Sequence, residues 1–346
     1  MVAVTEIARR QLGSVSGRLR SLPILALSVH SACNCRCVMC DIWKANAAKR
    51  EISADELERH MDGIRRLHVQ RVMLTGGEPL LHRNLWALCD RLRSEGINIS
   101  LVTTGLLVEQ HADEIAAVID ELVVSIDGPP DVHDEIRRTR GGFDRIARGL
   151  SRLATHRERP KVIARSVVQQ ANHAVLAQTV EAIRALAVNR LSFLAADVSS
   201  TAFNRPEPWD QSRRSEIAVT RELLPALRES IREVERKCEE ILASGFVAGG
   251  TGSLQRIYDY YSALAALSPF PTVRCNAPWV SAVLEPGGQL SPCFFQPAYS
   301  APTHEPFDVM LNAPGARRFR KALDVATNPT CQRCVCSLSL PSWAEA

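Results

Sequence analysis

The sequence predicts an α/β protein, namely a partial (β/α)6 TIM-like barrel of parallel strands with a helical bridge and a small cysteine-rich C-terminal domain. Three observations support this fold class. Short apolar runs alternate with helically spaced apolar residues up to residue 200. Polar, glycine-containing motifs follow these runs directly, where the loops of the functional face of a parallel barrel lie. Seven of the eleven cysteines gather at residues 33–40 and 331–336, far apart in the chain.

Six strand–helix units account for the barrel. We expect strands at residues 24–29, 71–74, 97–102, 122–126, 162–168 and 191–195. We expect helices between them at residues 53–67, 85–93, 112–119, 143–154 and 174–187. Asn172 is expected to cap the last of these helices. Beyond the barrel, residues 212–242 read as one extended helix and residues 254–267 as another.

Length and composition divide the chain and exclude some functions. The 346 residues, 46% apolar and 23% charged, suit a barrel with an appendage. We divide them into an N-terminal extension (1–22), the barrel (23–200), the helical bridge (201–272) and the C-terminal domain (273–346). A net charge of +4 is too small to indicate nucleic acid, and no apolar run is long enough for a membrane span or signal peptide. We therefore expect a cytoplasmic protein, where eleven cysteines indicate metal sites rather than disulfides.

The first cysteine group directly follows the first expected strand. Cys33, Cys37 and Cys40 form a C-x3-C-x2-C pattern, and Cys35 lies between them. Three thiolates from one loop can hold three corners of a 4Fe-4S cluster and leave the fourth iron open. Zinc is the alternative, with Cys35 as its fourth ligand. In the cluster interpretation Cys35 points away from the metal.

This pattern, with the apolar Met39 before the last cysteine, resembles the signature of the radical S-adenosylmethionine (SAM) superfamily. The resemblance implies that Cys33, Cys37 and Cys40 hold a catalytic 4Fe-4S cluster. It also implies that the open iron binds the amino and carboxylate groups of SAM, and that reductive cleavage of SAM gives a 5′-deoxyadenosyl radical. Residues around the loop then become candidates for SAM binding, Met39 among them.

Two strand-end motifs extend the resemblance. Gly76, Gly77, Glu78 and Pro79 resemble the superfamily's G-G-E-P motif, which contacts the SAM amino group; a tight turn is the structural alternative. Thr103 begins T-T-G, a near match to the T-N-G of relatives.

The next two strand ends supply three more candidates. Ser125 and Asp127 resemble the superfamily's ribose-binding position, and a capped turn before Pro129 is the alternative. Arg165 could reach the SAM carboxylate as a bidentate donor or form an ordinary salt bridge inside the barrel.

The second cysteine group belongs to the C-terminal domain. A hairpin with a Pro-Gly-Gly turn at 286–288 should bring Cys275 near Cys293, and Cys331 and Cys334 form a C-x2-C knuckle. Zinc and iron–sulfur clusters both fit four thiolates. The pattern resembles the twitch domain, the shorter relative of the SPASM domain, which implies a second, auxiliary 4Fe-4S cluster. Cys336 lies outside this set of four thiolates, and its alternative roles are those of a ligand, a packing residue or a hydrogen-atom donor.

The resemblance predicts a radical SAM oxidoreductase that abstracts a substrate hydrogen atom and passes an electron to the auxiliary cluster, oxidising a small natural-product or sugar-type metabolite. A maturase of ribosomally made peptides and an epimerase with a cysteine hydrogen donor are the alternatives. A zinc-binding or electron-transfer protein is the non-enzymatic alternative. A flavodoxin or ferredoxin would supply the reducing electron, and no nucleic acid or membrane partner is expected. The sequence leaves the substrate open.

Overall fold

A computed structural model describes residues 17–340. Within them one eight-stranded sheet has the order β6-β5-β4-β3-β2-β1-β7-β8. Neighbouring strands are parallel from β6 to β7, and β8 is antiparallel to β7. The parallel α/β architecture predicted above is confirmed. The strands are β1 (Ile24–His30), β2 (Arg71–Gly76), β3 (Asn98–Thr103), β4 (Glu121–Ser125), β5 (Lys161–Val168), β6 (Arg190–Ala195), β7 (Ser281–Glu285) and β8 (Gln289–Ser291).

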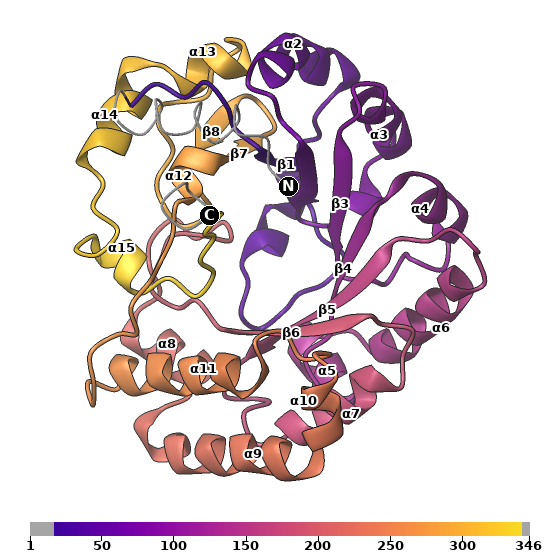
Figure 1. The fold of residues 1–346 in the computed structure, drawn as a ribbon, viewed down its shortest axis with the longest axis vertical. Helices are drawn as coiled ribbons and strands as arrows, with labels where there is room; N and C mark the ends of the chain where they lie inside the picture. The colour runs from indigo at the N-terminus through magenta and orange to yellow at the C-terminus, as the bar shows by residue number, and fades with distance from the viewer. Residues whose placement is uncertain (1–16, 341–346) are drawn as a thin grey trace.

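Helices cover the outer side of the curved sheet, as Figure 1 shows for α2, α3, α4 and α6. Each turns an apolar face inward: in α6, Ile146, Leu150 and Leu153 are buried. Ser53 caps α2 by accepting a hydrogen bond from the Glu56 amide, as its sequence predicts. The first helices are η1 (Ile42–Ala48), α2 (Ala54–Arg66), η2 (Pro79–Leu81), α3 (Leu85–Arg93), α4 (Ala112–Val118), α5 (Pro130–Arg137), α6 (Gly142–Ala154) and α7 (Leu176–Arg184).

The helical bridge differs from the prediction. The single helix expected over residues 212–242 is wrong, because the chain becomes extended at Ala218 and Thr220 and Pro225 occupies the first turn of a new helix. The helix expected at 254–267 is present. The bridge consists of α8 (Gln211–Ile217), η3 (Arg221–Leu223), α9 (Leu224–Lys237), α10 (Glu239–Ala243) and α11 (Gly250–Leu264).

The C-terminal segment completes the sheet. The predicted hairpin is present as β7 and β8, and β7 adds to the sheet beside β1, which the sequence analysis did not foresee. Figure 1 shows this segment beside β1, at the open side of the curved sheet. Its helices are α12 (Ala277–Val280), α13 (Phe307–Leu311), α14 (Pro314–Ala322) and α15 (Pro329–Gln332).

Two expectations concern the chain ends and membranes. The N-terminal extension expected at residues 1–22 falls mostly on residues 1–16, outside the described residues. Between residues 17 and 340, no helix combines the length and apolarity needed to cross a bilayer.

Candidate active site

The first cysteine group lines a cavity at the carboxyl ends of the parallel strands. Cys33, Cys37 and Cys40, together with Met39, form part of its wall, and its volume is about 260 Å³. We call it the central cavity. Its other walls come from the ends of β2 to β6, so loops far apart in sequence meet here, as expected of a parallel barrel.

The two glycines after β2 let the cysteine loop lie directly against the sheet. A Cβ on Gly77 would lie 2.0 Å from the Ala32 carbonyl oxygen, and one on Gly76 would lie 2.4 Å from that of His30. The Gly77 amide donates to the His30 carbonyl at 2.7 Å. Only glycine fits such an approach, and both glycines also line the central cavity. The motif is therefore more than a tight turn.

The Glu78 carboxylate is held by hydrogen bonds from the protein. It is completely buried and accepts hydrogen bonds from the Thr103 hydroxyl (2.8 Å), the Thr104 amide (2.7 Å) and the Leu80 amide (3.0 Å). Burial raises its pKa, against the lowering effect of these hydrogen bonds. The side chain thus joins the ends of β2 and β3 behind the cavity wall, and Pro79 begins η2 beside it. It is not among the residues that line the cavity.

Asp127 is likewise held by the protein. Its Oδ2 accepts a 2.6 Å hydrogen bond from Arg137 Nε, and its Oδ1 accepts one from the Val167 amide at 2.8 Å. Asp127 is fully buried and does not line the central cavity, whereas Ser125 does. Arg137 also donates to Cys37 Sγ at 3.5 Å. The carboxylate therefore orients the arginine that contacts a cluster thiol, while Ser125 keeps access to a ligand.

A second arginine fastens the cysteine loop from the side of the bridge. Arg205 is buried, pairs with Asp197 at 2.7 Å and donates to the Met39 carbonyl at 3.2 Å. Its guanidinium lies 3.7 Å from the centre of the Trp209 ring, and the Trp209 indole donates to Asp41 just after the last cysteine. The loop is thus held on both sides by charged hydrogen bonds.

The thiols of the loop differ in acidity. Burial raises the pKa of Cys33 to about 12 and that of Cys40 to about 11. The pKa of Cys37 is lowered, by a hydrogen bond from Cys35 and by the positive charge of Arg137. Cys35 is buried, does not line the central cavity and lies 3.6 Å from the Thr139 hydroxyl. Cys35 therefore contacts Cys37 without lining the cavity itself.

Arg165 points a guanidinium into the central cavity. It lines the cavity, and its buried Nε has no hydrogen-bond partner. The salt bridge considered as an alternative is absent within residues 17–340. Thr103 also lines the cavity. Asn172 does not cap α7 as expected, since that helix begins four residues later; its amide instead donates to the Asp127 carbonyl at 2.7 Å.

The C-terminal cysteines converge on a second, small cavity. Cys275, Cys293, Cys331, Cys334 and Cys336 all line it, and we call it the cysteine cavity. The Gln296 amide donates to Cys331 Sγ at 3.3 Å, a contact suited to a metal-bound thiolate. Cys336 lines the central cavity as well, together with Phe295. The cavities of the two cysteine groups therefore share a wall that includes Phe295 and Cys336.

The donor sets fit clusters better than a single ion. In the described part of the chain, no group of three or more His, Cys, Asp or Glu side chains could hold a metal ion. The thiols instead surround hollow spaces, and thiolates around a cavity are the ligand set of iron–sulfur clusters. Cys33, Cys37 and Cys40 would hold one cluster, with the central cavity open in front of it for a ligand from outside the protein.

The fold and this site define a parallel α/β protein with cysteine-lined cavities at the carboxyl ends of its strands. Residues 27–192 match the family described as the radical SAM superfamily. Residues 27–192 therefore form a radical SAM domain, and the predicted resemblance is confirmed for this region. That family implies a 4Fe-4S cluster and SAM.

Curated relatives resemble the barrel region only. A probable GTP 3′,8-cyclase of Methanopyrus kandleri is 33% identical over 134 residues, which cover 38% of this chain and 43% of that protein. A GTP 3′,8-cyclase of Xanthomonas campestris is 35% identical over 143 residues, covering 38% and 42%. The chain thus spans less than half the length of these relatives.

Solved structures resemble nearly the whole chain at low identity. SuiB of Streptococcus suis, bound to its precursor peptide SuiA, has a TM-score of 0.62 and 15% identity, covering 94% of this chain and 73% of that one. The enzyme anSMEcpe with bound AdoMet has a TM-score of 0.63 and 15% identity, covering 90% and 86%. At such identity the likeness shows a shared fold, C-terminal region included.

Sequence reasoning missed Arg137, Arg205 and Trp209. The first lies on α5, which begins with Pro130, the second proline of a pair; Pro at the first helical position is a helix-start signal that could have been recognised. Arg205 and Trp209 lie in a Pro-containing loop, where no periodicity indicates contact with the cysteine loop. Only the fold brings them there.

Proposed function

We propose that the protein is an oxidoreductase that cleaves SAM, abstracts a hydrogen atom from a small polar metabolite and passes one substrate electron to an auxiliary 4Fe-4S cluster. The observation that carries the proposal is the wall shared by the two cysteine groups. Because Phe295 and Cys336 line both cavities, a substrate radical formed at the border of the central cavity would lie next to the auxiliary thiols. Electron transfer to the auxiliary cluster would then need no further carrier.

Residues of the central cavity are assigned roles within this proposal. When bound, the first cluster and SAM supply a 5′-deoxyadenosyl radical. Arg165 receives the SAM carboxylate, because its buried Nε lacks any other acceptor. Ser125 and Thr103 face the cavity and bind SAM hydroxyl or amine groups. Neither Asp127 nor Glu78 lines the cavity. Asp127 holds Arg137 in place, and Glu78 holds Thr103 and Thr104 in place.

The auxiliary site is proposed to use Cys275, Cys293, Cys331 and Cys334. All four thiols line the cysteine cavity, and burial raises the pKa of Cys293 to about 11 and of Cys334 to about 12. Ligation by iron would remove these protons. A reducing compartment such as the cytoplasm, and a flavodoxin or ferredoxin as electron donor, belong to the same proposal.

Iron content and electron paramagnetic resonance test the proposal. Anaerobically reconstituted wild type should contain about eight irons, and the Cys33/Cys37/Cys40→Ala triple variant about four, because each cubane holds four. SAM should perturb the signal of the wild type only. The control is Cys89→Ala, a buried cysteine on α3 that lines neither cavity. About four irons plus one zinc in the wild type would remove the electron acceptor and contradict the oxidation.

Epimerisation is a second candidate, favoured by the position of Cys336. Its thiol lies in the wall between the two cavities, where it could return a hydrogen atom to a substrate radical. Substrate deuterium uptake from solvent without net oxidation, lost in Cys336→Ala, would support epimerisation. One 5′-deoxyadenosine per product oxidised by two electrons supports the oxidation instead.

A further inference from the structure

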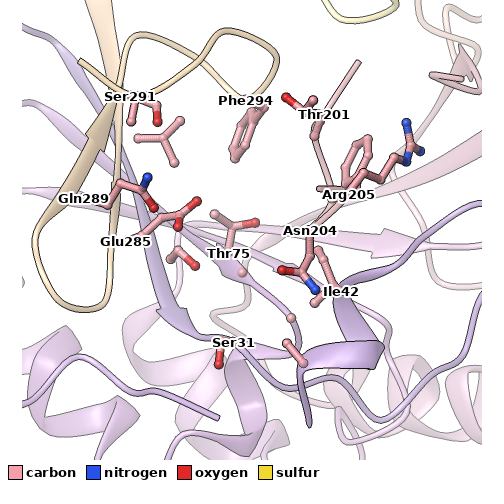
Figure 2. Close-up of a pocket in the computed structure, with 18 of the residues that line it drawn as sticks. Ser31, Ile42, Thr75, Thr201, Asn204, Arg205, Glu285, Gln289, Ser291 and Phe294 are labelled. Carbon is pink, nitrogen blue, oxygen red and sulfur yellow. The ribbon is translucent and has the colours of Figure 1, made fainter. Parts of the chain in front are cut away.

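A larger cavity opens beside the central cavity, between the cysteine loop and the β7–β8 hairpin (Figure 2). Its volume is about 510 Å³, the size of a small-molecule site. We call it the polar pocket. It shares Thr75, Gly77 and Phe294 with the central cavity, and Cys293 and Gln296 with the cysteine cavity. A molecule bound here would border both.

Uncharged hydrogen-bonding side chains line much of this pocket. They come from separate parts of the chain, and Figure 2 shows them around one space: Ser31, Thr75, Asn204, Gln289 and Ser291. Hydroxyl and amide groups of this kind pair with hydroxyl groups of a ligand as both donors and acceptors. The lining therefore suits a molecule rich in hydroxyls.

The pocket has one carboxylate in its lining, that of Glu285. Within residues 17–340, Glu285 forms no side-chain hydrogen bond or ion pair, although it lines the pocket at the end of β7. Burial raises its pKa, and the charge of Arg50 opposes that rise. A half-buried carboxylate without a partner is costly unless a ligand supplies a positive charge or donors.

The turn that carries Glu285 is firmly anchored. A Cβ on Gly288 would lie 1.8 Å from the Thr303 carbonyl oxygen, and the Gly287 amide donates to Glu56 on α2 at 2.7 Å. The Gly288 amide also donates to the Glu285 carbonyl at 3.1 Å. The position of the carboxylate is thus preorganised, as a specific binding site requires.

Backbone strain marks the opposite wall. Phe203 and Asn204 have φ angles of 61° and 63°, in the left-handed region that residues other than glycine rarely adopt. Both residues line the pocket, and the buried Arg205 holds this segment by its pair with Asp197. Strain maintained by surrounding contacts concentrates at ligand-binding sites.

The charges of the pocket distinguish between ligand classes. Arg205 is neutralised by Asp197, and Arg50 is exposed at the rim. The partly buried charge without an ion-pair partner is therefore that of Glu285. A triphosphate would need several free cations. We propose that the polar pocket binds the substrate, an amine-bearing, hydroxyl-rich small molecule whose ammonium group pairs with Glu285; this assignment rests on the proposed function.

Binding to the reconstituted, SAM-loaded protein tests the assignment without turnover. The probes are glucosamine and its neutral counterpart glucose, measured by anaerobic saturation-transfer NMR. Glucosamine should bind the wild type at least tenfold more tightly than glucose, and Glu285→Gln should abolish this difference. Glu305→Gln, an exposed acidic residue near the hairpin that lines none of the three cavities, should retain it.

Four results would overturn the assignment. The first is equal affinity for the two sugars, and the second is no binding of either. The third is a preference for glucosamine that survives in Glu285→Gln. The fourth is tighter binding of GTP that is lost in Arg50→Gln. If the proposed function is wrong, the wild type will fail to cleave SAM or will lack iron. The sugar-binding experiment measures neither SAM cleavage nor iron content, so the two failures can be distinguished.

Discussion

Replacing Arg137 by Met should destabilise the protein by about 3 kcal/mol. Arg137 is 8% exposed and Asp127 is 0% exposed, with 2.6 Å between Nε and Oδ2. Removing one partner of a buried pair costs about 3–5 kcal/mol because a charge stays buried without compensation. The hydrogen bond from the Val167 amide to Asp127 survives, which favours the lower end of that range.

The measurement is urea unfolding of iron-free protein under reducing conditions. Adding Asp127→Asn to Arg137→Met should recover more than half of the loss, because a neutral amide costs less to bury and its oxygen can still accept from Val167. Arg148→Met is the control, since its ion pair with Glu109 is exposed and should contribute at most about 1 kcal/mol. An Arg137→Met variant as stable as this control, or a double variant no better than the single one, would refute the reasoning.

Three further predictions concern the loop, the ligand and pH. Gly77→Ala should lower iron incorporation at the first cluster, because the added methyl overlaps the Ala32 carbonyl; normal iron content would contradict this. Arg165→Lys should weaken SAM binding about tenfold in equilibrium dialysis, since one ammonium replaces a bidentate donor, and unchanged affinity would argue against the contact. Burial lowers the pKa of His133 from 6.5 to about 4, so the unfolded state binds more protons and stability falls as pH falls through this window. His133 should contribute a loss of about 2 kcal/mol between about pH 7 and pH 5 in the iron-free protein, and His133→Asn should remove this contribution.

Local signals in the sequence were sufficient for the barrel and the first cluster site. The spacing of apolar residues predicted α3 to the residue and the six parallel strands closely, because buried strands and amphipathic helices impose their own periods. Cys33, Cys37 and Cys40 lie within one short loop, so their convergence required no long-range contact. Gly76 and Gly77 were recognisable for the same reason.

The tertiary structure decided which polar groups remain available to ligands. Glu78 and Asp127 were expected to meet SAM, yet both are buried against partners 25 and 10 residues away, Thr103 and Arg137. Arg165, in contrast, was left without a partner. A carboxylate's sequence context does not reveal which donor the fold will place beside it.

The same reason explains the C-terminal region. Its hairpin was predictable from a Pro-Gly-Gly turn, but the addition of β7 beside β1 depends on pairing across more than 250 residues. That pairing places Glu285 and Gln289 on the wall of the polar pocket and sets Cys336 between two cavities. The sequence by itself determined the chemistry of the proposed first cluster site, because the three cysteines proposed as its ligands are neighbours in the chain. The substrate side was decided by the tertiary structure, because its walls come from segments that meet only when the sheet is complete.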